Sequence, residues 1–80
     1  MLNNVIDITS IMAIKEIGKL LELSADDSNS FFNALKSGNT LAEALRKIGI
    51  VSASQISLKT WPLLRKWRDV YFPNNVKIKV

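Results

Sequence analysis

Apolar side chains recur along the first third of the chain with the period of an α-helix. From about Ser10 onward they lie three or four positions apart, while lysines and glutamates occupy the opposite side. Gly18 interrupts this pattern at a cost of about 1 kcal/mol relative to alanine, which indicates a close approach by another helix. The pattern therefore predicts an amphipathic helix from about Ser10. Its apolar stripe consists of Ile11, Ile14, Ile17, Leu20, Leu21 and Leu23.

Start and stop signals predict two further helices. Ser24 is a good N-cap for a helix over about 25–37, and Gly38 follows as a stop signal. The core face of this helix is Phe31, Phe32, Ala34 and Leu35. Thr40 and Glu43 form a capping-box pattern at the start of a third helix, which Gly49 ends. Its apolar positions, at i, i+3, i+4 and i+7, are Leu41, Ala44, Leu45 and Ile48.

The last part of the chain predicts one short helix, one longer helix and a strand. Ser52 and Gln55 repeat the capping-box pattern and predict a short helix over about 53–59. Pro62 is tolerated only in the first turn of a helix, so we expect a break near Thr60 and a new helix from Trp61. The residues of this helix expected to face the core are Leu63, Leu64, Trp67, Val70 and Tyr71.

Residues 76–80 alternate between apolar and basic side chains as a β-strand does. A lone strand leaves its backbone groups unpaired, so it must pair with residues 4–9, with a second copy or with another partner, or else remain a frayed tail. One expectation is a homodimer through Val76, Ile78 and Val80. We therefore expect a single domain over residues 1–80 of the mainly α class. It is a small bundle of four or five short helices, either with or without a short C-terminal β-strand.

Composition narrows the function. The 80 residues include no cysteine and no histidine, which excludes disulfides, thiolate nucleophiles, the commonest metal ligand and the commonest general base. We expect a binding domain and not an enzyme, with no cofactor and no metal. No apolar run approaches the roughly 18 residues of a membrane span, and no basic region precedes the first apolar stretch. We expect a cytoplasmic protein that does not act at a membrane.

The positive charge is concentrated in the second half of the chain. The net charge is +4, but residues 1–49 hold five basic and six acidic residues, whereas residues 50–80 hold six basic residues against Asp69 alone. A polyanion would therefore meet mainly the second half. The alternative interpretation is a solvated basic face without a partner.

Residues 31–67 have the order of elements found in a helix-turn-helix: a helix, a Gly-Asn turn, a capped helix and a Ser-rich start to another helix. The segment from Gly38 to Ile50 resembles the helix-turn-helix of insertion-sequence transposases and phage terminase small subunits. In those proteins a Ser/Thr-rich recognition helix that ends in Trp-Arg follows a Gly-Ile pair. Here Trp67 and Arg68 match that ending, but Trp67 follows Gly49 by eighteen residues, with Pro62 between them. The resemblance implies duplex DNA as the partner and a phage or mobile element as the context.

On this interpretation, residues 52–60 are the recognition element, and basic residues further along contact phosphates. The candidate DNA-binding residues are Ser52, Ser54, Gln55, Ser57, Lys59, Thr60, Arg65, Lys66 and Arg68. The alternative for the serines is a capped loop without a ligand.

Aromatic residues alternate with basic ones in the last helix, which permits other functions. Trp61, Trp67, Tyr71 and Phe72 could stack bases of a single strand, seat the helix on a membrane surface or recognise a protein partner. Because Trp67 and Tyr71 are spaced i, i+4, we expect both in the core instead. The rival to DNA binding is thus a protein-interaction or adaptor module that uses this helix.

Overall fold

The computed structural model describes residues 8–73, which form four α-helices and one short 3₁₀ turn. The elements are α1 (Ile8–Leu21), α2 (Ala25–Lys36), α3 (Leu41–Lys47), η1 (Ala53–Gln55) and α4 (Thr60–Tyr71). The predicted mainly α class is confirmed. The predicted strand 76–80, and pairing through Val76, Ile78 and Val80, lie outside the described residues. Helix α1 begins at Ile8, so the strand alternative for residues 4–9 is wrong for its last two positions.

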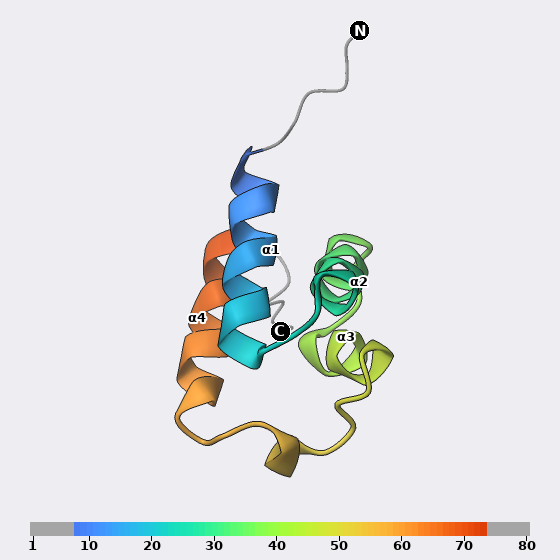
Figure 1. The fold of residues 1–80 in the computed structure, drawn as a ribbon, viewed down its shortest axis with the longest axis vertical. Helices are drawn as coiled ribbons and strands as arrows, with labels where there is room; N and C mark the ends of the chain where they lie inside the picture. The colour runs from blue at the N-terminus through green and yellow to red at the C-terminus, as the bar shows by residue number, and fades with distance from the viewer. Residues whose placement is uncertain (1–7, 74–80) are drawn as a thin grey trace, which may run out of the picture.

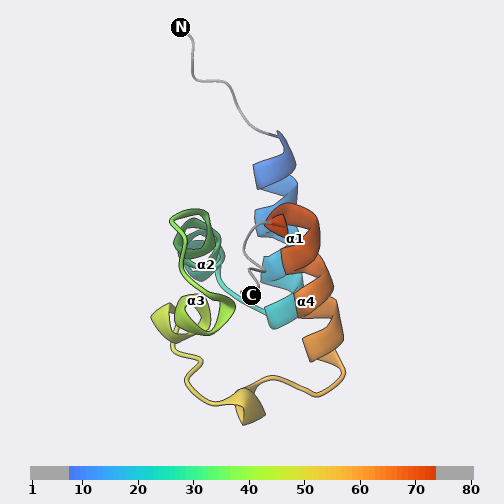
Figure 2. The same ribbon diagram turned by 180° about the vertical axis from the view of Figure 1, so that it is seen from behind.

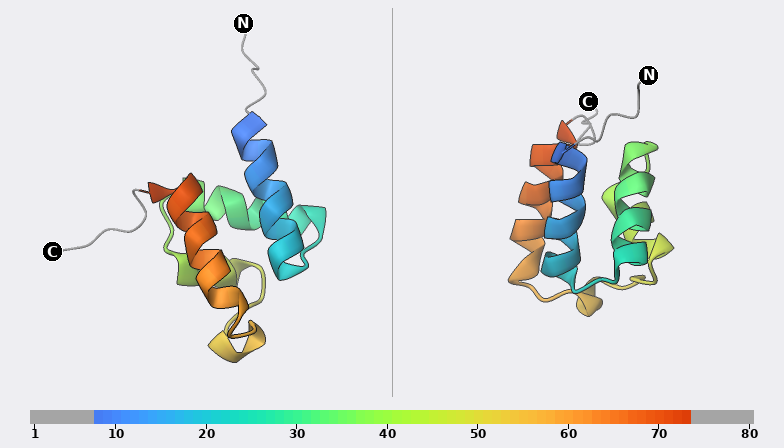
Figure 3. Two further views of the ribbon diagram at one scale, coloured as in Figure 1. Left: turned by 90° about the vertical axis from the view of Figure 1, so that its left-hand side faces the viewer. Right: turned by 45° about the horizontal axis from the view of Figure 1, so that its top comes forward.

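The helices form two pairs that pack against each other. Helices α1 and α4 lie side by side and run in opposite directions, while α2 and α3 form the other pair (Figures 1 and 2). The connection between α3 and α4 passes below both pairs and carries η1 (Figure 1). In Figure 3 the outer side of the α1–α4 pair faces the viewer on the left.

The predicted caps of α2 and α3 are confirmed. The Ser24 hydroxyl accepts from the Asp27 backbone N–H at 3.1 Å. The Thr40 hydroxyl accepts from the Glu43 N–H at 3.1 Å, and the Glu43 carboxylate accepts from the Thr40 N–H at 2.9 Å. Gly38 and Gly49 follow α2 and α3 with φ of 101° and 89°, a region that favours glycine, so each chain reversal is fixed locally.

The core lies where the two helix pairs meet, and Trp67 of α4 is at its centre. The Trp67 indole N–H donates to the Ala13 carbonyl in α1 at 3.0 Å, and its ring lies 5.6 Å from that of Phe31 in α2. The predicted burial of Trp67 is therefore confirmed. The buried apolar residues are Ala13, Ile17, Phe31, Phe32, Ala34, Leu35, Leu41, Ala44, Leu45, Ile56, Leu64 and Trp67.

Two predicted apolar faces are wider than the faces that are buried. Leu63 and Val70 of α4 are exposed, although the pattern placed both in the core. They lie on the flank of α4 beside α1 and away from the α2–α3 pair, which covers only the face that carries Leu64 and Trp67. In α1, Ile11 is exposed as well, while Ala13 is fully buried beneath the Trp67 indole.

The predicted helix over 53–59 is also wrong. Only Ala53–Gln55 is helical, as one 3₁₀ turn, and Ile56 then adopts an extended backbone that places its side chain in the core. Helix α4 begins at Thr60 with Pro62 in its first turn, one residue earlier than predicted. One turn suffices to position the connection, because Ile56 is the only residue between Ile50 and Leu64 that must be placed in the core.

The third helix can be tested through its cap and its core residue. Thr40→Ala removes the side-chain acceptor of the capping box and should lower the free energy of unfolding by about 1 kcal/mol. Leu45→Ala leaves a cavity between α2 and α3 and should cost about 2–5 kcal/mol. Urea denaturation measures both, and equal, negligible losses would contradict the assignment of α3.

The predicted close approach at Gly18 is confirmed and gives a second test. A Cβ atom on Gly18 would stand 2.7 Å from Ser28 Oγ in α2. Gly18→Ala should therefore destabilise the domain, because overpacking of about 1–3 kcal/mol outweighs a gain in helix propensity of about 1 kcal/mol.

Ser28→Ala provides the rescue, because the nearest atom to the added methyl group is then Ser28 Cβ at 3.7 Å. The double variant should be more stable in urea than Gly18→Ala alone. A rise in the unfolding midpoint for Gly18→Ala alone would show that the two helices do not meet here.

Candidate nucleic-acid interface

The side chain of Gln55 is fully engaged within its own loop. Its Oε1 accepts from the backbone N–H groups of Val51 and Ser52, both at 2.9 Å. Its Nε2 donates to the Gly49 carbonyl at 3.3 Å. An amide that reads adenine needs both ends free for the base. In this conformation Gln55 holds the loop together and does not have both ends free for a base, so its role as a base-reading residue stays a prediction.

The neighbouring serines also bond to their own loop. Ser52 Oγ accepts from the Ser54 N–H at 3.3 Å and lies 2.9 Å from Ser54 Oγ. Ser57 Oγ accepts from the Lys59 N–H at 3.2 Å. These contacts match the alternative interpretation, a capped loop.

A carboxylate lies beside this loop, and its negative charge would repel the phosphates of DNA. Glu22 lines the same hollow as Gln55, Ser57 and Thr60. Thr60 is itself only partly exposed. The predicted order of α2, a turn and α3 is present, but residues 52–60 do not form a recognition helix.

The three predicted basic residues of α4 do not share one face. Arg68 pairs with Asp69 at 3.2 Å, and its side chain is only 18% exposed. Lys66 lines a groove between α1 and α4. The Arg65 guanidinium lies over the ring of Trp61, 5.9 Å from its centroid, and Trp61 itself lines a hollow beside α3. Of the three, only Arg65 is thus both exposed and in contact with Trp61.

A hollow of about 320 Å³ lies between α3, η1 and the start of α4, and Trp61 closes one side of it. The Trp61 indole N–H donates to the Ala53 carbonyl at 3.4 Å, which ties α4 to η1. Arg46 of α3 lines the same hollow. The hollow therefore has a mainly apolar lining with Arg46 on one wall and Trp61 on the other, and Arg65 lies over the Trp61 ring without lining the hollow. The remaining lining residues are Leu41, Ala42, Leu45, Ile50, Val51, Ser52 and Ala53.

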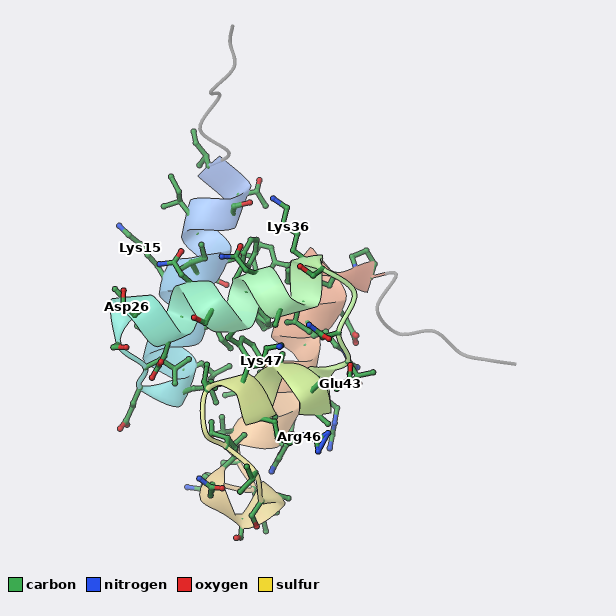
Figure 4. The ribbon with its side chains drawn as sticks, turned by 90° about the vertical axis from the view of Figure 1, so that its right-hand side faces the viewer. Lys15, Asp26, Lys36, Glu43, Arg46 and Lys47 are labelled. Carbon is green, nitrogen blue, oxygen red and sulfur yellow. The ribbon has the colours of Figure 1, made fainter. Side chains whose placement is uncertain are left out.

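Sequence reasoning missed Arg46 as a site residue. With Lys47 it forms the basic last turn of α3, a position that also complements the helix dipole. Figure 4 shows both side chains on the exposed side of the α2–α3 pair, together with Lys36. The available signal was the stretch without acidic residues that contains Arg46, because no acidic residue occurs between Glu43 and Asp69.

The electrostatics of this region are unbalanced. Residues 44–68 hold six basic and no acidic residues: Arg46, Lys47, Lys59, Arg65, Lys66 and Arg68. Among residues 8–73, the pair between Arg68 and Asp69 is the one salt bridge. Glu43, the nearest acidic residue before this stretch, is bonded to the Thr40 N–H. The other cations keep their charge available for an external anion.

The other aromatic side chains of this region pack inside the protein. Trp67 lies 5.7 Å from Tyr71 and 5.8 Å from Phe72, and Phe72 lies 5.2 Å from Phe32. The Tyr71 hydroxyl donates to Glu16 at 3.1 Å. Desolvation and this contact with Glu16 raise the pKa of Tyr71. These rings are unavailable for stacking on bases in this conformation.

Comparison of the chain with family models, curated proteins and solved structures finds no match. Across residues 8–73, no helix has the length and apolar character needed to cross a membrane.

The role of Gln55 can be tested by substitution. Gln55→Ala removes three hydrogen bonds around η1, each with a net value of about 0.5–1.5 kcal/mol and less where exposed. We expect a loss of about 1 kcal/mol or more in urea denaturation. Ser54→Ala, one residue earlier and equally exposed, removes only a contact with Ser52 and is the control. Equal losses of stability for the two substitutions would contradict the role of Gln55 in holding the loop together.

Proposed function

We propose that this domain binds duplex DNA through the exposed cations of α3, of the loop before α4 and of α4 itself. The observation that carries the proposal is that Arg46 lines the Trp61 hollow and Arg65 lies over the Trp61 ring, with no acidic residue lining the hollow. The resemblance of residues 38–50 to helix-turn-helix segments supports the same partner.

The chemistry of these side chains fits a phosphate backbone. Guanidinium groups donate several hydrogen bonds to phosphate oxygens, and each contact releases condensed counterions. The phosphate contacts are assigned to Arg46, Lys47, Lys59 and Arg65, all of which are exposed. Arg68 is excluded because Asp69 neutralises it.

The loop chemistry favours general binding over sequence-specific binding. The polar side chains proposed for base contacts, Gln55 above all, are already bonded within residues 49–59. A protein that contacts mainly phosphates discriminates little among sequences. The rival function, a protein-interaction module, predicts only micromolar or weaker binding to DNA, which vanishes near physiological salt.

The proposal predicts a specific salt dependence. In the double variant Arg46→Ala, Arg65→Ala, the slope of log affinity against log salt should fall in magnitude by up to about 1.8, or about 0.9 for each phosphate contact. Several unrelated duplexes should lose affinity equally, because phosphate contacts carry no sequence information. Fluorescence anisotropy with labelled duplexes measures both quantities.

The matched control is Lys15→Ala, Lys19→Ala, which removes the same charge from α1. Lys15 lies far from Arg46 in Figure 4. This control should leave the slope nearly unchanged. Equal changes of the slope in the two double variants would show that the effect depends only on net charge and not on these two arginines. No DNA binding at about 50 mM salt would exclude the function and favour the protein-interaction module.

A further inference from the structure

A second surface, on the opposite flank of α4, has the properties of a protein interface. It is a groove of about 410 Å³ between α1 and α4, viewed from outside in Figure 3 (left). Leu63 and Val70 lie on its rim with 54% and 61% of their surface exposed. Met12, one turn before Glu16 on α1, is 51% exposed. The lining residues are Glu16, Leu20, Leu63, Lys66, Trp67, Val70 and Tyr71.

The apolar rim has the repeat of a helix-packing seam. Leu63 and Val70 are seven residues apart and so lie on one side of α4, two turns from each other. Single exposed apolar residues are ordinary on a protein surface, but these two line one groove together with Leu20 and Trp67. Covering them would remove the largest exposed apolar side chains of α4 from water.

The two walls of the groove carry opposite charges. Glu16 stands on α1 and Lys66 on α4, and within residues 8–73 neither forms a salt bridge. Because α1 and α4 lie side by side, a copy related by a two-fold axis parallel to these helices can set its α4 wall against the α1 wall of the first (Figures 1 and 3). In that arrangement each lysine faces the glutamate of the other copy, so the groove is complementary to itself.

We propose that a second copy of this chain docks on the α1–α4 groove. The interface is isologous: Leu63 and Val70 of both copies form its apolar centre, and Lys66 of each copy pairs with Glu16 of the other. The Arg46 and Arg65 surface lies on the other flank of α4 and stays open in the dimer. The proposal does not rest on DNA binding.

Charge reversal tests the pairing. The full chain is studied by sedimentation at increasing concentration in about 50 mM salt, where surface charges are least screened. Glu16→Lys or Lys66→Glu alone places like charges across both halves of the interface and should weaken association at least about tenfold. An equimolar mixture of the two variants should associate again, because every contact between unlike partners is then complementary.

Mixing the two variants distinguishes a contact between two copies from an effect of each substitution within its own chain. Glu16→Lys also removes the acceptor of the Tyr71 hydroxyl, so circular dichroism must show that each variant is folded. Glu16→Gln keeps an acceptor for Tyr71 and removes only the charge, so it should weaken association less than the reversal. A mixture that stays as dissociated as its components overturns the proposal.

The apolar centre has a matched control within the chain. Leu63→Ser with Val70→Ser should dissociate the dimer. Val51→Ser with Leu58→Ser changes residues that are more exposed, at 73% and 85%, and that lie outside the groove, so association should not change.

Three further outcomes would also overturn the proposal. The natural chain could remain monomeric up to about 1 mM, which would mean a dissociation constant too high for a specific dimer. The dimer could survive the Leu63 and Val70 substitutions. It could also dissociate on deletion of residues 76–80 alone, which would place the contact on the predicted strand.

Discussion

Burial of the Trp67 indole holds the two helix pairs together. Its N–H donates to the Ala13 carbonyl of α1, and its ring contacts Phe31 of α2 and Phe72 beyond α4. A tryptophan can be buried this deeply only when its single donor has a partner. The backbone of α1 provides that partner, and it can do so because Ala13 has too small a side chain to hold α4 away.

This one contact sets the rotation of α4 about its own axis. With Leu64 and Trp67 turned inward, Arg65 and Trp61 are directed toward α3, whereas Leu63, Lys66 and Val70 are directed toward the outer side of α1. The two candidate surfaces of the domain are therefore opposite flanks of one helix. A different rotation that buried Leu63 and Val70 would move Trp61 away from the hollow that it shares with Arg46.

The loop before α4 has a mechanical role that its composition conceals. The Gln55 side chain hydrogen-bonds to three backbone groups between residues 49 and 52, and the Trp61 indole N–H donates to the Ala53 carbonyl. Together with buried Ile56, these bonds attach the connection to both α3 and α4. Polar residues that resemble a ligand-binding set are here the means by which a short, serine-rich loop satisfies its own backbone.

Features that depend only on neighbours along the chain could be predicted from the amino-acid sequence. The N-caps at Ser24 and Thr40 and the stops at Gly38 and Gly49 use hydrogen bonds and dihedral angles within a few residues, so local pattern located α2 and α3 correctly. The i, i+4 spacing of Trp67 and Tyr71 likewise indicated a core face. The capping box at Ser52 also formed, but a capping box specifies where a helix starts and not how far it continues.

The burial of particular apolar residues, and the set of side chains that share one hollow, depend on how the helices pack. Periodicity gives the width of an apolar face, whereas the number and position of neighbouring helices set how much of it is covered; Leu63 and Val70 were therefore assigned wrongly. Arg46 and Trp61 line one hollow because of how α3 and α4 are placed, and no local pattern encodes that placement. The charge imbalance of residues 44–68 could be read from the sequence, but packing between helices places Arg46 in this hollow and Lys66 in the groove on the α1 side.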